Sequence, residues 1–213
     1  MKRLFLAIGL ALFLTPLFLA AAETTLPPPT TKGGKPLFDA LASRASAPGG
    51  ANFPSRALDP QDLSTLLWAG SGLNRPGRWT VPFAMGVEPY VRIYVFGPEE
   101  VALYNWSRHS LLQVEEGDWR SRVNPQGFAR AASHILVFVS DKTPLQGKGG
   151  IPEVWDKWLG VATGAMTQDI YLAADALGIG ARYAETMDQP FLREILTIPS
   201  GEAPLAILAL GKR

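Results

Sequence analysis

Side chains that can act as nucleophiles, acids or metal ligands are scarce in this chain of 213 residues. It contains no cysteine and only two histidines, His109 and His134. Thiol catalysis and zinc–thiolate sites are therefore excluded, and a zinc site of another kind is disfavoured because Cys and His are the usual zinc ligands. A Ser-His-Asp arrangement is compatible with the spacing, but no Gly-x-Ser-x-Gly turn is present. We expect His134, which begins an apolar run, to be a structural residue.

Nucleotide-binding loops are also missing. Gly178-Ile179-Gly180 is followed by Ala181 and lacks the third glycine of a dinucleotide fingerprint, and it follows an expected helix, not a strand. No GxxxxGK phosphate loop occurs. If the protein catalyses a reaction, a bound cofactor is therefore expected to supply the chemistry.

Residues 1–22 have the layout of a secretory signal peptide. They contain a basic start, an unbroken apolar run and three alanines before Glu23. The alternative is a membrane anchor, since residues 4–22 are nearly long enough to span a bilayer. Pro16 and the alanine ending favour cleavage. We therefore expect a periplasmic protein with no stable membrane span after cleavage.

Charge and length limit the remaining classes. Loss of Lys2 and Arg3 with the signal changes the net charge from +1 to −1, with 18 basic and 19 acidic residues. Such a balance gives no electrostatic reason to expect nucleic acid or an anionic membrane as a partner. The remaining chain, about 190 residues, is long enough for one domain with a substantial core. Without cysteine, disulfides cannot stabilise an exported chain, so packing, with or without oligomerisation, must do so.

The apolar pattern predicts alternating helices and strands. Residues 23–36, rich in Thr, Pro and Gly, are expected to form a flexible or extended arm. Asp59 and Pro60 form a strong helix start, because Asp can cap a helix and Pro suits its first position. Helices are predicted over residues 37–44, 60–70, 126–132, 154–177 and 189–196, and strands over 90–96, 101–104, 109–114, 133–140 and 203–210. This order indicates a single domain over 37–213, an α+β or α/β sandwich.

The predicted helix over residues 154–177 is the longest periodic segment. Gly160 and Gly164 lie four residues apart on it, which would let another backbone approach closely. The simpler interpretation is a central helix packed against its neighbours within the domain. The alternative is a helix that forms a dimer.

Several short segments, in one shared order, resemble the nitroreductase family, most closely its exported and thiazole-oxidase-like branches. Leu66-Leu67-Trp68-Ala69 precedes Gly72-Leu73-Asn74-Arg75, and further matches lie at residues 103–111, 167–172, 176–180 and 199–202. The likeness extends from about residue 37 to the C-terminus. It implies a three-layer α-β-α sandwich of the α+β class, with a central, mostly antiparallel sheet. It also implies a homodimer that holds FMN between its subunits.

The resemblance further implies a set of cofactor-binding residues. The family's Arg-Arg-Ser-x-Arg cluster, which clamps the FMN phosphate, keeps here only Arg44 and Ser46. Basic residues near the C-terminus of the family match Lys212 and Arg213, and Arg78 completes the expected set. Arg56 could replace a lost charge from a shifted loop. No metal ligand and no acid–base catalytic side chain is implied.

A second flavin-binding segment departs from the family pattern. The family's Pro-Ser-x-x-Asn-x-Gln is replaced by residues 82–88, with Phe83, Gly86 and Glu88 at the three polar positions. Each hydrogen bond lost at a buried polar cofactor costs about 1–3 kcal/mol if its partner stays unsatisfied. FMN binding is therefore expected only if other groups compensate.

Three functions follow as hypotheses from the resemblance. The first is an FMN-dependent oxidoreductase that reduces a nitroaromatic, a quinone or a similar planar acceptor. The second is a cofactor-free descendant that serves as a periplasmic ligand- or protein-binding module. The third is oxidation of a peptide, by analogy with the thiazole-oxidase branch. A homodimer is expected in each case.

Overall fold

The computed structural model describes residues 22–148 and 152–213, so nearly all of the expected signal peptide lies outside the described residues. Seven strands form one sheet in the order β1-β6-β5-β4-β7-β9-β8, and each neighbouring pair is antiparallel. In that order the strands are β1 (Glu23–Thr25), β6 (Ser110–Glu116), β5 (Glu100–Asn105), β4 (Val91–Phe96), β7 (His134–Ser140), β9 (Pro204–Lys212) and β8 (Ile179–Ala184).

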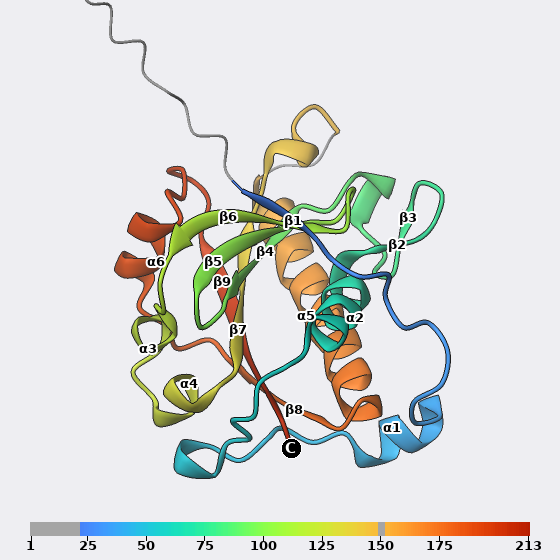
Figure 1. The fold of residues 1–213 in the computed structure, drawn as a ribbon. Coiled ribbons are helices and arrows are strands. Elements are labelled where there is room, and N and C mark those ends of the chain that lie inside the picture. Colours follow the sequence, from blue (N-terminus) through green and yellow to red (C-terminus); the bar gives the residue numbers. More distant parts are fainter. Residues whose placement is uncertain (1–21, 149–151) are drawn as a thin grey trace, which may run out of the picture.

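Helices cover both faces of this sheet (Figure 1). On one face lie α2 (Pro60–Ser71) and the long helix α5 (Pro152–Ala176), and on the other α3 (Arg120–Val123), α4 (Gly127–Ala131) and α6 (Gln189–Ile195). The remaining elements are α1 (Leu37–Ser43), the hairpin of β2 (Leu73–Arg75) and β3 (Arg78–Trp79), and the 3-10 turns η1 (Gly50–Asn52), η2 (Ala84–Gly86) and η3 (Thr143–Leu145). The predicted three-layer sandwich with an antiparallel sheet is confirmed.

Two apolar layers hold the sandwich together, one on each face of the sheet. Strand β7 contributes to both, since Leu136 and Phe138 pack towards α2 and α5, whereas Ile135 and Val137 pack towards α4 and α6. A strand buried on both faces needs an unbroken apolar sequence, which explains the run that begins after His134.

Helix α2 begins as the sequence predicts. The Oδ1 atom of Asp59 accepts a hydrogen bond of 2.8 Å from the backbone N–H of Asp62, and Pro60 occupies the first turn. The helix ends at Gly72, where a Cβ atom would collide with the ring of Trp68. Glycine is therefore required at this end, directly before the β2–β3 hairpin.

The N-terminal arm is extended and lies against the domain. Strand β1 pairs with β6, in the register Glu23 with Leu112, and so adds an edge strand that the composition did not predict. Farther along, the side chain of Gln61 donates to the carbonyl of Pro28 at 2.7 Å. The Nζ atom of Lys35 lies 2.6 Å from Asp175 at the end of α5. The arm thus joins the sheet edge, α2 and α5.

Candidate functional site

A cleft of about 520 Å³ runs along the exposed side of α5. The loop after α1, which carries Ser46, and strand β8, which carries Tyr183, form its other walls. Gly160 and Gly164 lie on the helical wall, and a Cβ atom at either would meet no other atom within 4 Å. The cleft therefore has a bare backbone wall that a flat molecule or a second chain can approach closely.

Tyr171 is the central residue of this cleft. Its hydroxyl lies 3.1 Å from Ser46 Oγ and accepts a hydrogen bond of 2.7 Å from the backbone N–H of Tyr183. The guanidinium of Arg44 lies over its ring, 5.2 Å from the centroid, a cation–π contact. Tyr171 lies in one of the matching segments, but no local signal in the sequence assigns it this role, because only the fold brings β8 and the loop after α1 to it.

Tyr183 and Glu185 form a polar pair at the same cleft. The phenol of Tyr183 donates a hydrogen bond of 2.9 Å to Glu185 Oε1. Burial, and then this bond to a carboxylate, raise the pKa of Tyr183 to about 12. The phenol therefore stays protonated at neutral pH and remains a hydrogen-bond donor.

Lys212 and Arg213, which were predicted to reach a phosphate, form ion pairs with carboxylates of this chain. Lys212 Nζ lies 2.7 Å from Asp62 Oδ2 and 3.1 Å from Asp59 Oδ2. Those two hydrogen bonds, with Asp62 the stronger influence, raise the pKa of Lys212. Arg213 Nη1 lies 3.9 Å from Asp175 Oδ1, at the end of α5.

Excess positive charge nevertheless remains at this end of the sheet, where the C-terminus lies near α1 (Figure 1). Ion pairs join Lys35 and Arg213 to Asp175, and Lys212 to Asp59 and Asp62. Two more cations belong to the same region, since Arg56 pairs with Lys212 through the backbone and Arg44 lies over Tyr171. Neither Arg44 nor Arg56 forms an ion pair with any carboxylate in the described part of the chain. Such guanidinium groups can hold an anion by charge-assisted hydrogen bonds.

The fifth predicted residue, Arg78, lies elsewhere. It is exposed on β3, and its Nη1 atom donates to the carbonyl of Gly77 at 2.9 Å. It does not line the α5 cleft. Of the five predicted residues, Arg44 and Ser46 therefore lie together at Tyr171. Lys212 and Arg213 lie at the same end of the sheet. Arg78 lies apart from all four.

The segment that departs from the family pattern lines a second cleft, of about 460 Å³, with Trp79, Met85, Gly86 and Glu88 among its walls. Met85 is 65% exposed and has a φ of 58°, a strained value for a side chain of this kind. Phe83 instead points into the core, with its ring 5.2 Å from Tyr90 and edge-on to it. A buried aromatic ring has therefore replaced a polar side chain at this position.

His109 belongs to a buried polar network and not to a catalytic triad. Its Nε2 atom lies 2.7 Å from Ser64 Oγ and 3.1 Å from the carbonyl of Pro27, and its Nδ1 atom lies 2.9 Å from the Tyr104 hydroxyl. Ser64 is fully buried and donates to the Pro27 carbonyl at 2.5 Å. The serine therefore has no access to a substrate, and the network holds the arm against α2. In the described residues no cluster of His, Asp and Glu could hold a metal ion.

The model of the Nitroreductase family matches residues 52–212. The chain belongs to the nitroreductase family. It is 28% identical over 190 residues to a Methanocaldococcus jannaschii protein named as a nitroreductase, with 83% of this chain and 91% of that protein covered. A crystal structure of a Ralstonia eutropha protein, described as a nitroreductase, superposes with a TM-score of 0.79 at 29% identity, covering 91% of this chain and 92% of that one.

The fold is shared more widely at lower identity. The E. coli microcin synthetase complex with truncated pro-MccB17 bound contains a chain with a TM-score of 0.62 at 18% identity, covering 99% of this chain and 85% of that one. Nitroreductase-family proteins are oxidoreductases that generally use a flavin and commonly act as dimers on small substrates. The unpaired guanidinium of Arg44 fits the phosphate of such a cofactor, and the cleft beside Ser46, which is lined by both polar and apolar groups, fits its planar ring.

Proposed function

We propose that this protein is an FMN-dependent oxidoreductase that reduces a small planar acceptor, such as a nitroaromatic or a quinone. The observation that carries the proposal is the position of Tyr171, which binds Ser46 and Tyr183 at the cleft beneath the uncompensated guanidinium of Arg44. A cleft of about 520 Å³ lies within the range usual for small-molecule and cofactor sites.

The residues of this chain have distinct roles in the proposed enzyme. Arg44 and Ser46 hold the phosphate, with Arg56 and Arg213 as neighbouring charges. Tyr183, whose proton is donated to Glu185, offers the acceptor oxygen of its phenol, and the glycine wall of α5 accepts a flat group at close range. Bound FMN supplies the electron transfer, so no side chain has to act as the acid or base.

We further propose that the enzyme is a homodimer. The α5 cleft and the cleft at Met85 share no lining residue and are separate within one protomer. Val161 projects from α5 and is 64% exposed, next to Gly160 and Gly164. An apolar side chain beside a bare helical backbone is suited to packing against a second copy of the chain.

The signal-like start supports a periplasmic location, and within the described residues no helix is long and apolar enough to cross a membrane. Fractionation of cells that express the full chain tests this location. Recovery in the osmotic-shock fluid, with a mature N-terminus at Glu23, is expected. Recovery with the membrane pellet at full length would contradict cleavage.

A second candidate function, a cofactor-free binding module, is favoured by two observations. Lys212 is held by Asp59 and Asp62 instead of being free for a phosphate. Phe83 has turned a polar flavin-binding position into part of the apolar core. In such a module the α5 cleft would bind another ligand or a protein.

The visible absorption spectrum of the purified protein, before and after incubation with FMN, distinguishes the two candidates. Bound flavin is expected, and Arg44→Met should weaken FMN binding about tenfold or more, because a hydrogen bond to a charged group contributes about 1.5–3 kcal/mol. Arg130→Met, an exposed arginine on α4, is the matched control and should leave FMN binding unchanged. A colourless wild-type protein that does not bind added FMN would refute the enzyme and leave the binding module.

A further inference from the structure

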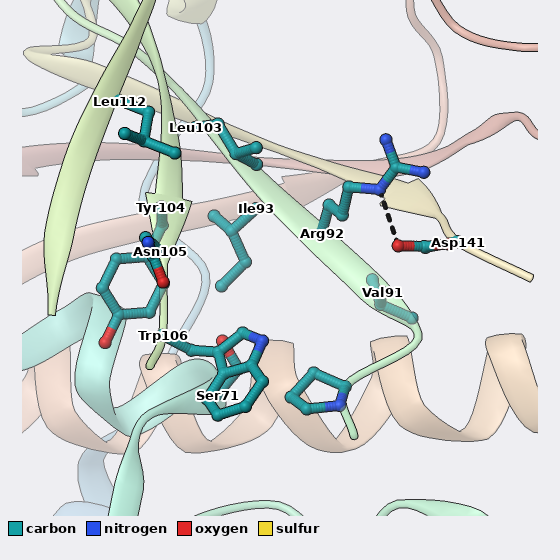
Figure 2. Close-up of a pocket in the computed structure, with 11 residues that line it drawn as sticks. Ser71, Val91, Arg92, Ile93, Leu103, Tyr104, Asn105, Trp106, Leu112 and Asp141 are labelled. Atoms are coloured by element: carbon teal, nitrogen blue, oxygen red, sulfur yellow. Dashed lines mark hydrogen bonds and ion pairs between the residues drawn. The ribbon is translucent and has the colours of Figure 1, made fainter. Parts of the chain in front are cut away.

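Strands β4 and β5 separate near one end of the sheet. Their pairing stops at Tyr94 with Leu103, whereas β4 continues to pair with β7 as far as Val91, and β5 with β6 as far as Asn105. A cavity of about 190 Å³ fills the opening, bounded by both strands, the end of α2 and the turn after β5 (Figure 2). It shares no lining residue with the α5 cleft.

Most of the cavity wall is apolar. Val91 and Ile93 line it from β4, and Leu103 and Leu112 from β5 and β6. The indole of Trp106 lies at the end nearest α2, as Figure 2 shows. An apolar cavity of about 150 Å³ is known to accept a benzene ring, so the space between these strands is large enough for a single aromatic ring.

Two polar groups at the Trp106 end of the cavity have no partner among the described residues. Ser71, the last residue of α2, is 2% exposed, and its hydroxyl makes no hydrogen bond with them. The Oδ1 atom of Asn105 accepts bonds from Ser107 and Arg108, which leaves its amide nitrogen as a free donor. A ligand hydroxyl in the cavity can therefore bond with both groups, since a serine hydroxyl donates and accepts and an amide nitrogen donates.

The opposite end of the cavity has no charge to offer a ligand. Arg92 is bonded to Asp141 at 3.0 Å (Figure 2). It is also bonded to Glu202 at 2.8 Å, so carboxylates already compensate its guanidinium. An anion would meet these carboxylates without a free cation, and a cation would meet Arg92. The wall therefore selects a neutral molecule.

We propose that the cavity between β4 and β5 binds a neutral single-ring aromatic molecule that carries a hydroxyl group, a phenol. The ring packs against Ile93, Leu103 and Trp106, and the hydroxyl bonds with Ser71 and Asn105. This site is additional to the α5 cleft and does not depend on whether FMN binds there.

Titration of the isotopically labelled full chain with phenol, followed by NMR, tests the site. Phenol should shift the methyl signals of Ile93, Leu103 and Leu112 and the indole N–H of Trp106, with a dissociation constant of about 1 mM for so small a ligand. Toluene, which has no hydroxyl, should bind more weakly, and benzoate should not bind.

Two variants probe the contacts. Ser71→Ala should weaken phenol binding about fivefold, the effect of one hydrogen bond, and leave toluene binding unchanged. Ser200→Ala, an exposed serine in the turn before β9, is the matched control and should bind phenol like the wild type. Leu112→Phe should fill the cavity and abolish binding; its fold is checked by circular dichroism.

Each contrary result decides against the site. Absence of shifts up to about 10 mM phenol would overturn the proposal, since a ring filling this cavity should bind more tightly. Shifts confined to Thr167 and Tyr183 would place phenol in the α5 cleft instead. Equal phenol binding by Ser71→Ala and the wild type would refute recognition of the hydroxyl. If Leu112→Phe does not fold, the shift map and Ser71→Ala still decide.

Discussion

Replacement of His134 should reduce the loss of stability that acid causes. This residue opens β7, with its Nδ1 atom 2.9 Å from Ser133 Oγ. The guanidinium of Arg120 lies nearby and donates to the carbonyls of Ala132 and Ser133 at 2.6 and 2.9 Å. Burial, and then the positive charge of Arg120, lower the pKa of His134 from 6.5 to about 4.

The direction and size of the effect follow from linkage. Above pH 6.5 the imidazole is neutral in both states and has no effect on the pH dependence of unfolding. Between pH 6.5 and 4 the unfolded chain takes up a proton that the folded chain does not, so the folded state loses stability as the pH falls. At 1.36 kcal/mol per pKa unit, the full loss is about 3 kcal/mol, and it is complete near pH 4.

Urea unfolding followed by tryptophan fluorescence at pH 7 and pH 4.5 measures this loss at a fixed protein concentration. His134→Gln should lose about 2–3 kcal/mol less free energy of unfolding between the two pH values than the wild type. His109→Gln is a useful comparison, since burial also lowers the pKa of His109 and the effect has the same sign. Equal losses in wild type and His134→Gln would refute the reasoning, because His134 would then titrate alike in the folded and unfolded chains.

Three further changes test the packing, the dimer and the charges near the cleft. Val161→Glu should convert the proposed dimer to a monomer in size-exclusion chromatography with light scattering, because a carboxylate would enter the interface. Gly211→Ala should lower the free energy of unfolding in urea by about 1–3 kcal/mol, since its Cβ would collide with the carbonyl of Pro54. Asp62→Asn should tighten FMN binding several-fold in a titration followed by absorbance, since it weakens the hold on Lys212.

Each of these changes has a matched control. Val114→Glu introduces the same charge on β6, and the dimer should persist; a wild-type monomer would contradict the interface. Gly127→Ala adds a methyl group where the contacts are ordinary, so the free energy of unfolding should stay unchanged. An equal loss of stability in Gly127→Ala and Gly211→Ala would contradict the packing argument. Asp39→Asn removes an exposed charge on α1, and equal FMN affinity in both aspartate variants would show that Lys212 does not contribute.

The central elements of the fold could be predicted from the sequence. The capping aspartate and proline before α2, the unbroken apolar run of β7 and the periodic pattern of α5 are all local signals. They depend on residues a few positions apart, so the sequence alone carries them. The order of the matching segments then indicated the family, which the comparisons confirm.

The sheet edges could not be predicted in the same way. Strand β8 contains Gly180, Arg182 and an exposed Tyr183, and strand β1 is short and fully exposed, so neither has a strong apolar alternation. Each becomes a strand because β9 or β6 offers it a ladder of backbone hydrogen bonds. The partner, and not the local sequence, determines such a strand.

The candidate site likewise has features that the sequence determines and features that depend on the tertiary structure. The sequence determined that Arg44 and Ser46 lie together, because one residue separates them, and it determined the absence of thiol chemistry. Only the tertiary structure decided that Lys212 is held by Asp59 and Asp62, about 150 residues away in the chain, and that Phe83 points into the core. A charge or a ring acquires its role from the groups it meets in space, and long-range packing alone sets those neighbours.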